Sequence, residues 1–492
     1  MKTLQLLFVC ALAQILSLWL TVNAQDTIHD PAEYISHTLP VLYITTQDSA
    51  EIVSQEVYLD GTYYFDPMGV DGMDSIGSRD EQLPLKIKGR GNSTWNYDKK
   101  PYRLKLDKKA ALAGMNKSKH FVLLAHIEQH HSLFQDEIGF FISRQMGMPW
   151  TPNTQPIEVV INGDYRGLYT LAEKIRVDKD HVDIFEQEDG DPENSDVEHD
   201  EMDVTGGWLL EIDNYSEPGQ ILLNDYYWNK TIRITPHTPE VLSPKQRNYI
   251  TDLLTTVNNL IYTEDKNSTE WEQFIDLDAL ARFYVCREVV YDIEAFIGSC
   301  YFYKDKGDST KFIFGPVWDF GFSMLRWNEN QENFLYNTEN TFPQKHNHWI
   351  GEFCKFPRFQ EAVKRYWRTF KSEVSPKVVP YIQSYADRIR TVCLNGEYQR
   401  WPQYNENRIS SRLTSYINQF QQHQTFLSTQ WDLHGDINND GEVDVSDVNQ
   451  LINVILGKID ASEFYNNPDL TGDSLVDVSD VNALINILLG KQ

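Results

Sequence analysis

The chain has 492 residues, a formal net charge of -28 at pH 7, 13% aromatic residues and 12 Trp. The aromatic content predicts a substantial core, and the length leaves room for one large or two ordinary domains beside a small terminal module. The negative charge argues against nucleic acid as a partner, because a phosphate backbone is held by Lys and Arg.

The first 24 residues have the layout of a cleavable secretory signal. Lys2 precedes a mainly apolar run from Leu6 to Leu20, and Val22-Asn-Ala24 stands before Gln25. We therefore expect a secreted protein in an extracellular or cell-surface complex. No later apolar run approaches the roughly 20 residues that cross a bilayer, so no membrane span is expected.

Four cysteines follow the signal: Cys286, Cys300, Cys354 and Cys393. Their spacings match no zinc motif. Buried free thiols and one or two disulfides are both compatible with the sequence.

The pattern of apolar and turn residues over 35–430 predicts a mixed α+β core, with strands in its first part and helices in its last part. Strand patterns cover 39–46, 84–89, 102–107, 120–125 and 207–213, and a hairpin is expected over 157–172 with its turn at Asn162-Gly163. Helical periodicity covers 135–146, the region from 243 to about 291, and 359–430. Between Glu186 and Asp203 ten of eighteen residues are acidic, which indicates a solvated insertion loop.

Several segments of this core supply groups that phosphoryl transfer needs, because that reaction depends mainly on positioning and charge neutralisation. Gly89-Arg-Gly91 leaves backbone amides open to phosphate oxygens, with a tight hairpin turn as the alternative. Lys105 on the next predicted strand is a candidate phosphate cation, with Glu173 as its possible partner. Arg90, Lys86 and Lys88 compete for that role, and an exposed lysine paired with a surface carboxylate is the alternative.

Six stretches together resemble the CotH family of spore-coat and secreted proteins, over roughly residues 40 to 370. They are 86–95, 99–107, 162–175, 206–213, 301–306 and 314–320. CotH proteins are atypical protein kinases. The resemblance therefore implies a kinase-like fold that binds ATP with Mg²⁺ or Mn²⁺ and phosphorylates Ser or Thr of a protein substrate.

The family pattern places a metal-binding aspartate at Asp319, directly after Trp318. A carboxylate at an apolar strand end is costly unless a cation or hydrogen-bond donors satisfy it, and the alternative is a turn cap. Upstream, Asp292 or Glu294 would hold the acceptor proton or a second metal. Gly321 stands where many relatives have another acidic or amide residue, so a pseudokinase is an alternative.

One acidic loop occurs twice in the last sixty residues, and its oxygen side chains have the spacing of a calcium loop. An apolar stripe of helical period follows each loop and stops at Gly457 or Gly490. The expected ligand positions of the first loop are Asp436, Asn438, Asp440, Glu442, Asp444 and Asp447. Those of the second are Asp469, Thr471, Asp473, Leu475, Asp477 and Asp480, with Ser474 where glycine is preferred.

These repeats, over 434–492, resemble the type I dockerin of cellulosome-type assemblies. The resemblance implies two Ca²⁺ sites and a cohesin partner on a scaffold, with Val445, Ser446, Val478 and Ser479 at the recognition positions. The predicted protein is therefore a kinase-like core anchored by a dockerin. A non-catalytic module of a polysaccharide-degrading complex is the alternative, and a glycoside hydrolase in polysaccharide catabolism is a third reading. The scarcity of ATP outside cells is the main physical objection to a secreted kinase.

Overall fold

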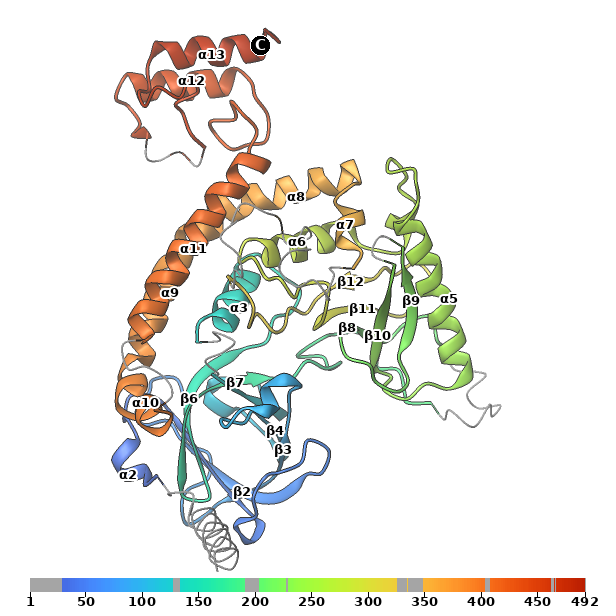
Figure 1. Cartoon of the computed structure of the whole chain (residues 1–492), viewed down its shortest axis with the longest axis vertical. Coiled ribbons are helices and arrows are strands. Elements are labelled where there is room, and N and C mark those ends of the chain that lie inside the picture. Colours follow the sequence, from blue (N-terminus) through green and yellow to red (C-terminus); the bar gives the residue numbers. More distant parts are fainter. Residues whose placement is uncertain are drawn as a thin grey trace, which may run out of the picture. The chain divides into compact units, whose positions relative to one another are not determined.

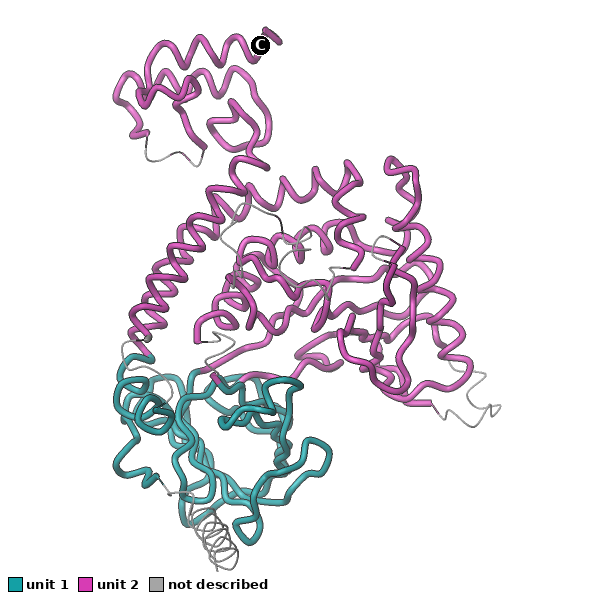
Figure 2. Tube along the Cα trace, viewed as in Figure 1, with its two compact units in different colours: residues 1–125, 156–171, 389–406 teal, residues 126–155, 172–388, 407–492 magenta. Residues whose placement is uncertain are grey.

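The computed structural model describes residues 29–126, 133–190, 203–226, 229–324, 334, 348–402, 408–461, 464 and 466–491. The predicted secretory signal and residues 191–202 of the acidic segment lie outside them. The chain divides into two compact units (Figure 2). The first comprises 1–125, 156–171 and 389–406, and the second 126–155, 172–388 and 407–492.

The described part of the first unit is a closed barrel with the strand order β1-β2-β3-β4-β5-β7-β6 (Figure 1). β1 pairs with β6 in parallel, and this pairing closes the sheet. The predicted strand-rich first part is confirmed, but it is a barrel rather than a kinase lobe. The strands are β1 (Val41–Thr46), β2 (Leu59–Asp66), β3 (Leu83–Gly89), β4 (Tyr102–Ala110), β5 (Ser118–Ala125), β6 (Thr154–Ile161) and β7 (Asp164–Glu173).

Alternating residues of β3 and β4 contribute to the core of the barrel. Leu85 and Ile87 of β3 and Leu104 and Leu106 of β4 are buried, while the polar residues between them point outward. Short helical segments complete the unit: α2 (Pro31–Tyr34), η1 (Gln47–Ser49), η2 (Ser93–Asn96), η3 (Leu112–Gly114), η8 (Cys393–Glu397) and α10 (Tyr398–Arg400).

A buried ion pair joins η8 to the barrel. Lys99 Nζ lies 2.5 Å from Glu397 Oε1 and donates to the Leu168 carbonyl at 2.6 Å. The Leu168 N–H donates to the other carboxylate oxygen of Glu397 at 2.7 Å. Burial without such partners would be prohibitive for either charge, so these bonds fix η8 against β7.

The second unit contains an antiparallel sheet with the order β12-β11-β8-β10-β9 in its described part. Its helix α5 (Pro244–Ile261) packs on β9 and starts with a capping box of Ser243 and Gln246 (Figure 1). The strands are β8 (Trp208–Asp213), β9 (Ile221–Asp225), β10 (Lys230–Thr238), β11 (Cys300–Lys304) and β12 (Ile313–Phe314).

The other helices of this unit include three that confirm the predicted helical late part: α6 (Leu277–Glu288), α8 (Pro357–Thr369) and α11 (Arg408–Trp431). Cys286, Cys300, Cys354 and Cys393 are free thiols. None of the described helices is long and apolar enough to cross a membrane. The remaining helical segments are α3 (Gln135–Gln145), η5 (Glu270–Gln273), α7 (Ile350–Phe353), η7 (Phe370–Val374) and α9 (Ser375–Val392).

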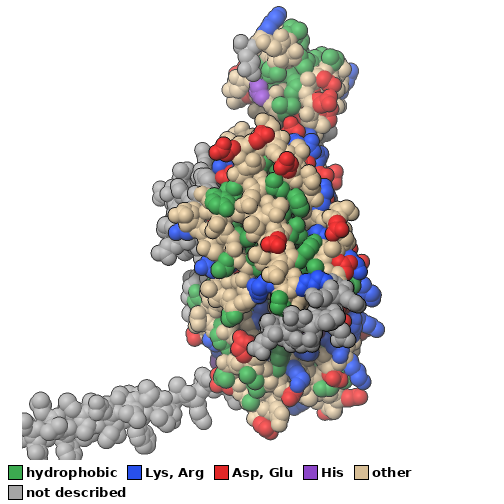
Figure 3. Space-filling model, turned by 90° about the vertical axis from the view of Figure 1, so that its right-hand side faces the viewer, with side chains coloured by type: hydrophobic (Ala, Val, Ile, Leu, Met, Phe, Trp, Pro, Cys, Tyr) green, Lys and Arg blue, Asp and Glu red, His purple; other side chains and the backbone are tan. Residues whose placement is uncertain are grey.

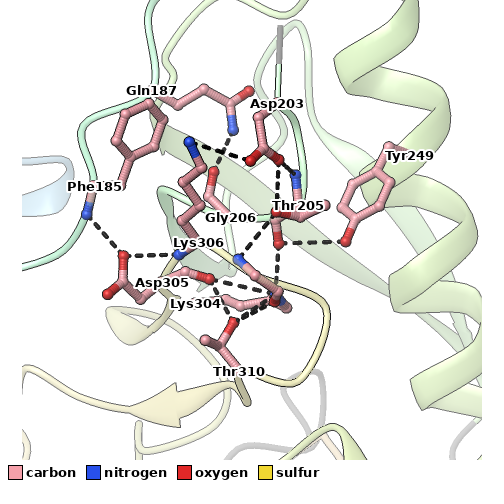
Figure 4. A network of polar contacts seen from close by, with 11 residues as sticks. Phe185, Gln187, Asp203, Thr205, Gly206, Tyr249, Lys304, Asp305, Lys306 and Thr310 are labelled. Carbon is pink, nitrogen blue, oxygen red and sulfur yellow. Dashed lines mark hydrogen bonds and ion pairs between the residues drawn. The ribbon is translucent and has the colours of Figure 1, made fainter.

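A polar network around Lys304 fastens the end of β11 to the segment that enters β8 (Figure 4). The buried ammonium group donates to the carbonyls of Thr205 and Gly307 and to the Thr310 hydroxyl, the last two at 2.7 and 2.8 Å. Burial lowers the pKa of Lys304, and nearby aspartates oppose that shift. Lys306, on the rim of this network, pairs with Asp203 at 3.2 Å.

Replacement of Lys304 by Met is expected to lower the free energy of unfolding by about 2 kcal/mol, because buried carbonyl groups lose their donor. Urea denaturation of the two proteins measures the difference. Lys306→Met is the matched control. Both partners of its ion pair are well exposed, so a loss under about 1 kcal/mol is expected. Equal losses in the two variants would contradict the structural role of Lys304.

The C-terminal module consists of α12 (Val445–Ile455) and α13 (Val478–Leu488), each preceded by one acidic loop. Ile437, Leu451 and Leu484 form its small buried core. Gly457 and Gly490 follow the helices with φ of +67° and +62°, the left-handed conformation in which helices commonly end. The predicted pair of loop-helix units is confirmed.

Candidate functional site

The strongest candidate carboxylate of the core, Asp319, lies in a strained turn after β12. Its backbone has φ of +58°, a conformation uncommon for residues with a side chain, and its side chain is exposed. The next N–H, of Phe320, donates to Asp136 Oδ1 at 2.8 Å. On the other flank, the Trp318 carbonyl accepts from Arg287 at 2.7 Å. Hydrogen bonds on both sides therefore hold the turn that presents Asp319.

The second candidate, Asp292, is fully buried and forms an ion pair with Arg287 at the end of α6. The other carboxylate oxygen accepts the Glu294 N–H at 3.3 Å. Burial raises the pKa of Asp292 to about 6; the Arg287 charge opposes this shift and the Asp319 charge adds to it. Glu294 is only partly exposed and lies in the turn that follows Asp292.

Arg287 brings the two candidate segments together. Its side chain is 1% exposed, and its guanidinium bonds the Asp292 side chain and the Trp318 carbonyl and lies 3.4 Å from the Ser299 carbonyl. It also stacks on the Phe320 ring, with 4.4 Å between the guanidinium carbon and the ring centroid. A single buried cation thus links the segment after α6 to the Asp319 turn.

Sequence reasoning missed two residues of this centre, Arg287 and Asp136. A charged residue among the apolar positions of 279–290 was the available signal for Arg287, since Arg is seldom fully buried without a partner. Asp136 gave no signal, because an acidic residue in the first turn of a helix already has a sufficient explanation.

The proposed phosphate cations lie on the first unit. Lys105 points outward from β4 and is exposed, opposite Lys86 of β3 and His120 of β5. Arg90 directly follows β3, and its N–H donates to the Pro101 carbonyl at 3.2 Å.

Glu173 belongs to the second unit and is fully buried at the end of β7. One carboxylate oxygen accepts the backbone and side-chain N–H groups of Asn153 at 3.0 and 2.9 Å. The other lies 4.0 Å from His181 Nε2. Burial raises the pKa of Glu173, and the Asn153 bonds oppose that shift.

In the first acidic loop, two aspartates organise the backbone. Asp436 accepts the N–H groups of Asp440 and Gly441 at 3.0 and 2.9 Å. Asp447 accepts those of Ile437, Asn438 and Asp444. Gly441 has φ of +96°, as the sharp turn at position 6 requires. Burial raises the pKa of Asp436, and the Asp447 and Asp440 charges add to the shift.

The second loop repeats this arrangement with small differences. Asp469 accepts the Ser474 N–H at 2.8 Å, and Asp480 accepts those of Leu470 and Thr471 at 2.8 and 3.0 Å. Ser474 itself has φ of +70°, which glycine would adopt at lower cost.

Both loops are rich in carboxylate oxygens, the hard ligands that Ca²⁺ prefers. In the described part of the chain, no group of three or more His, Cys, Asp or Glu side chains is arranged to hold a metal ion. In the loops, the carboxylates instead bond the backbone N–H groups. The crowding of carboxylates around buried Asp436 is nevertheless the electrostatic setting that a divalent cation relieves.

Comparison with protein families gives two matches that do not overlap. The model described as CotH kinase protein matches residues 87–430, and the type I dockerin domain matches residues 434–489. A search of curated proteins finds no match.

Proposed function

We propose that this chain, which belongs to the CotH kinase protein family and carries a type I dockerin domain, is a secreted kinase anchored to a scaffold. The core would transfer the γ-phosphoryl group of ATP to a Ser or Thr hydroxyl of a protein. Type I dockerins are calcium binders, and the partner of this one would be a cohesin. Because ATP is scarce outside cells, the protein would act during export or use another phosphoryl donor.

The roles follow from the charges that phosphoryl transfer has to neutralise. Asp319 would hold Mg²⁺ or Mn²⁺, which supplies positive charge to the phosphate oxygens. Asp292 or Glu294 would stand near the acceptor hydroxyl. Arg90 or Lys105 would contribute cationic charge, and Glu173 would belong to the nucleotide site.

The observation that carries this proposal is the exposed carboxylate of Asp319 on a turn fixed by two hydrogen bonds, one buried and one partly buried. A strained backbone held by its surroundings is typical of functional sites. Among the described residues the Asp319 side chain is exposed, so it is accessible to a cation.

Calorimetric titration of the full chain with ATP and Mg²⁺ or Mn²⁺ tests the proposal. Asp319→Asn is expected to weaken nucleotide binding at least tenfold, because the proposed metal ligand loses its charge. Asp278→Asn is the matched control, since it removes an exposed carboxylate that forms an ion pair with exposed Arg365 and should leave binding unchanged. Equal affinity of wild type and Asp319→Asn would reject Asp319 as the metal ligand.

A non-catalytic module is the second candidate, and one observation favours it. The Asp292 carboxylate is fully buried against Arg287, which limits its contact with a substrate hydroxyl. Gly321, two residues after Asp319, offers no second carboxylate. Absence of nucleotide binding to the wild type would select this candidate.

Exposed side chains support the docking half of the proposal. Val445 and Val478 begin α12 and α13 and are 67% and 62% exposed, although both are apolar. Ser446 and Ser479 follow them and are exposed as well. Equivalent apolar and hydroxyl groups are thus available to a cohesin at both repeats.

A further inference from the structure

One segment of this acidic protein has the opposite charge. Residues 83–125, which form β3, β4 and β5, contain eleven Lys and Arg against two Asp and no Glu, a local charge of +9. The whole chain has a net charge of -28. A concentration of positive charge in a protein that is negative overall indicates a surface that binds a negatively charged partner.

The barrel gathers part of this charge on its outer surface. Lys86 and Lys88 of β3 and Arg103 and Lys105 of β4 all point away from the core. Lys86 lies directly opposite Lys105, and Lys88 directly opposite Arg103. His120 of β5 continues the first row. We call these five residues the cationic face. In Figure 3, Lys and Arg side chains gather in the lower part of the view.

This arrangement is unfavourable for the sheet itself. Like charges directly opposite each other on neighbouring strands repel, and here two such pairs are adjacent. Asp60 of β2 lies 3.0 Å from Lys86, but both side chains are more than half exposed, so the pair contributes little. The Lys88 ammonium lies 5.1 Å from the Tyr58 ring centroid, which adds an aromatic surface to the same rows. Stability of the barrel therefore does not account for the cationic face.

We propose that the cationic face binds an acidic polypeptide segment in extended conformation. Alternate side chains of an extended chain lie about 6.6 Å apart on one side, because each residue advances about 3.3 Å. Lys86 with Lys88, and Arg103 with Lys105, are themselves alternate residues of strands and have this same spacing. A segment with Asp or Glu at every second residue would meet one cation with each carboxylate. The inference does not depend on phosphoryl transfer by the core.

Fluorescence anisotropy with a labelled peptide of alternating Asp and Ser tests this surface on the full chain. The triple variant Lys86→Gln, Lys88→Gln, Arg103→Gln is expected to bind at least tenfold more weakly than wild type. The matched control is a triple variant of three exposed lysines elsewhere in the chain, which should bind like wild type. It carries Lys311→Gln, Lys364→Gln and Lys377→Gln. Wild-type binding should also weaken steeply with added salt. The melting temperature of the control variant should match that of the wild type, and that of the cationic-face variant should be equal or higher, because repulsion between the opposed like charges is relieved.

Equal binding by the two triple variants would overturn the proposal, as would equal binding of a peptide in which Asn replaces Asp. Binding of polygalacturonate but not of the peptide would assign the surface to an acidic polysaccharide instead. Displacement of the peptide by ATP at the concentration that saturates the calorimetric site would assign it to the nucleotide. Failure of ATP to bind at all would leave peptide binding unaffected and would count against the kinase proposal alone.

Discussion

Chelation of calcium with EGTA is expected to unfold the C-terminal module and to weaken cohesin binding at least a hundredfold. In the described part of the module the buried core consists of Ile437, Leu451 and Leu484, with seven partly buried neighbours, and so small a core does not stabilise a fold of this size by itself. Without the cation, the crowded carboxylates around Asp436 also repel one another. We therefore expect calcium binding to supply much of the folding free energy of this module.

Hydrogen exchange of the full chain measures this effect locally. Amides of α12 and α13 should lose their protection when EGTA is added, while those of the barrel should keep it. Asp447→Asn should lower the calcium affinity of the first loop by about tenfold or more. Glu442→Gln is the control, because position 7 of such a loop ligates through its backbone carbonyl. Unchanged protection together with unchanged cohesin binding after chelation would show that the loops do not bind calcium.

The local elements were predictable because their signals are local. The turn at Asn162-Gly163 and the alternation on both sides of it predict the hairpin of β6 and β7. The helix after each acidic loop follows from its apolar period and its terminal glycine. Barrel closure was not predictable in this way. It depends on parallel pairing of β1 with β6, more than a hundred residues apart, and no alternation of residues specifies which strands pair.

In the candidate site, too, the local features were predictable and the long-range contacts were not. Asp319 and Asp292 could be proposed from motifs that surround them in the sequence. Their assembly could not, because it depends on Arg287 and on Asp136, which is 184 residues from its partner Phe320. Arg287 donates to backbone carbonyl groups as well as to a carboxylate. A backbone carbonyl is present at every residue, so the sequence does not indicate which one accepts a hydrogen bond.

Replacement of Arg287 by Met is expected to cost about 3–5 kcal/mol of stability, because it leaves a buried carboxylate without its counter-ion. The variant also removes the donor to the Trp318 carbonyl and so loosens the Asp319 turn. Urea denaturation at pH 7.5 measures the loss. Arg365→Met is the matched control. Its pair with Asp278 is exposed on both sides, and a loss under about 1 kcal/mol is expected.

The pH dependence of Arg287→Met separates the lost charge pair from lost packing. The unfolded pKa of an aspartate is about 3.9, and that of folded Asp292 is already raised to about 6. A carboxyl group with a raised folded pKa contributes stability below its unfolded pKa and loses that contribution as pH rises through its folded pKa. Without Arg287 the folded pKa rises further, so the variant should lose more stability at pH 8 than at pH 5. Adding Asp292→Asn should recover part of the loss at pH 8, because no buried charge then remains. A loss that is independent of pH and not reduced in the double variant would mean that Arg287 acts through packing alone.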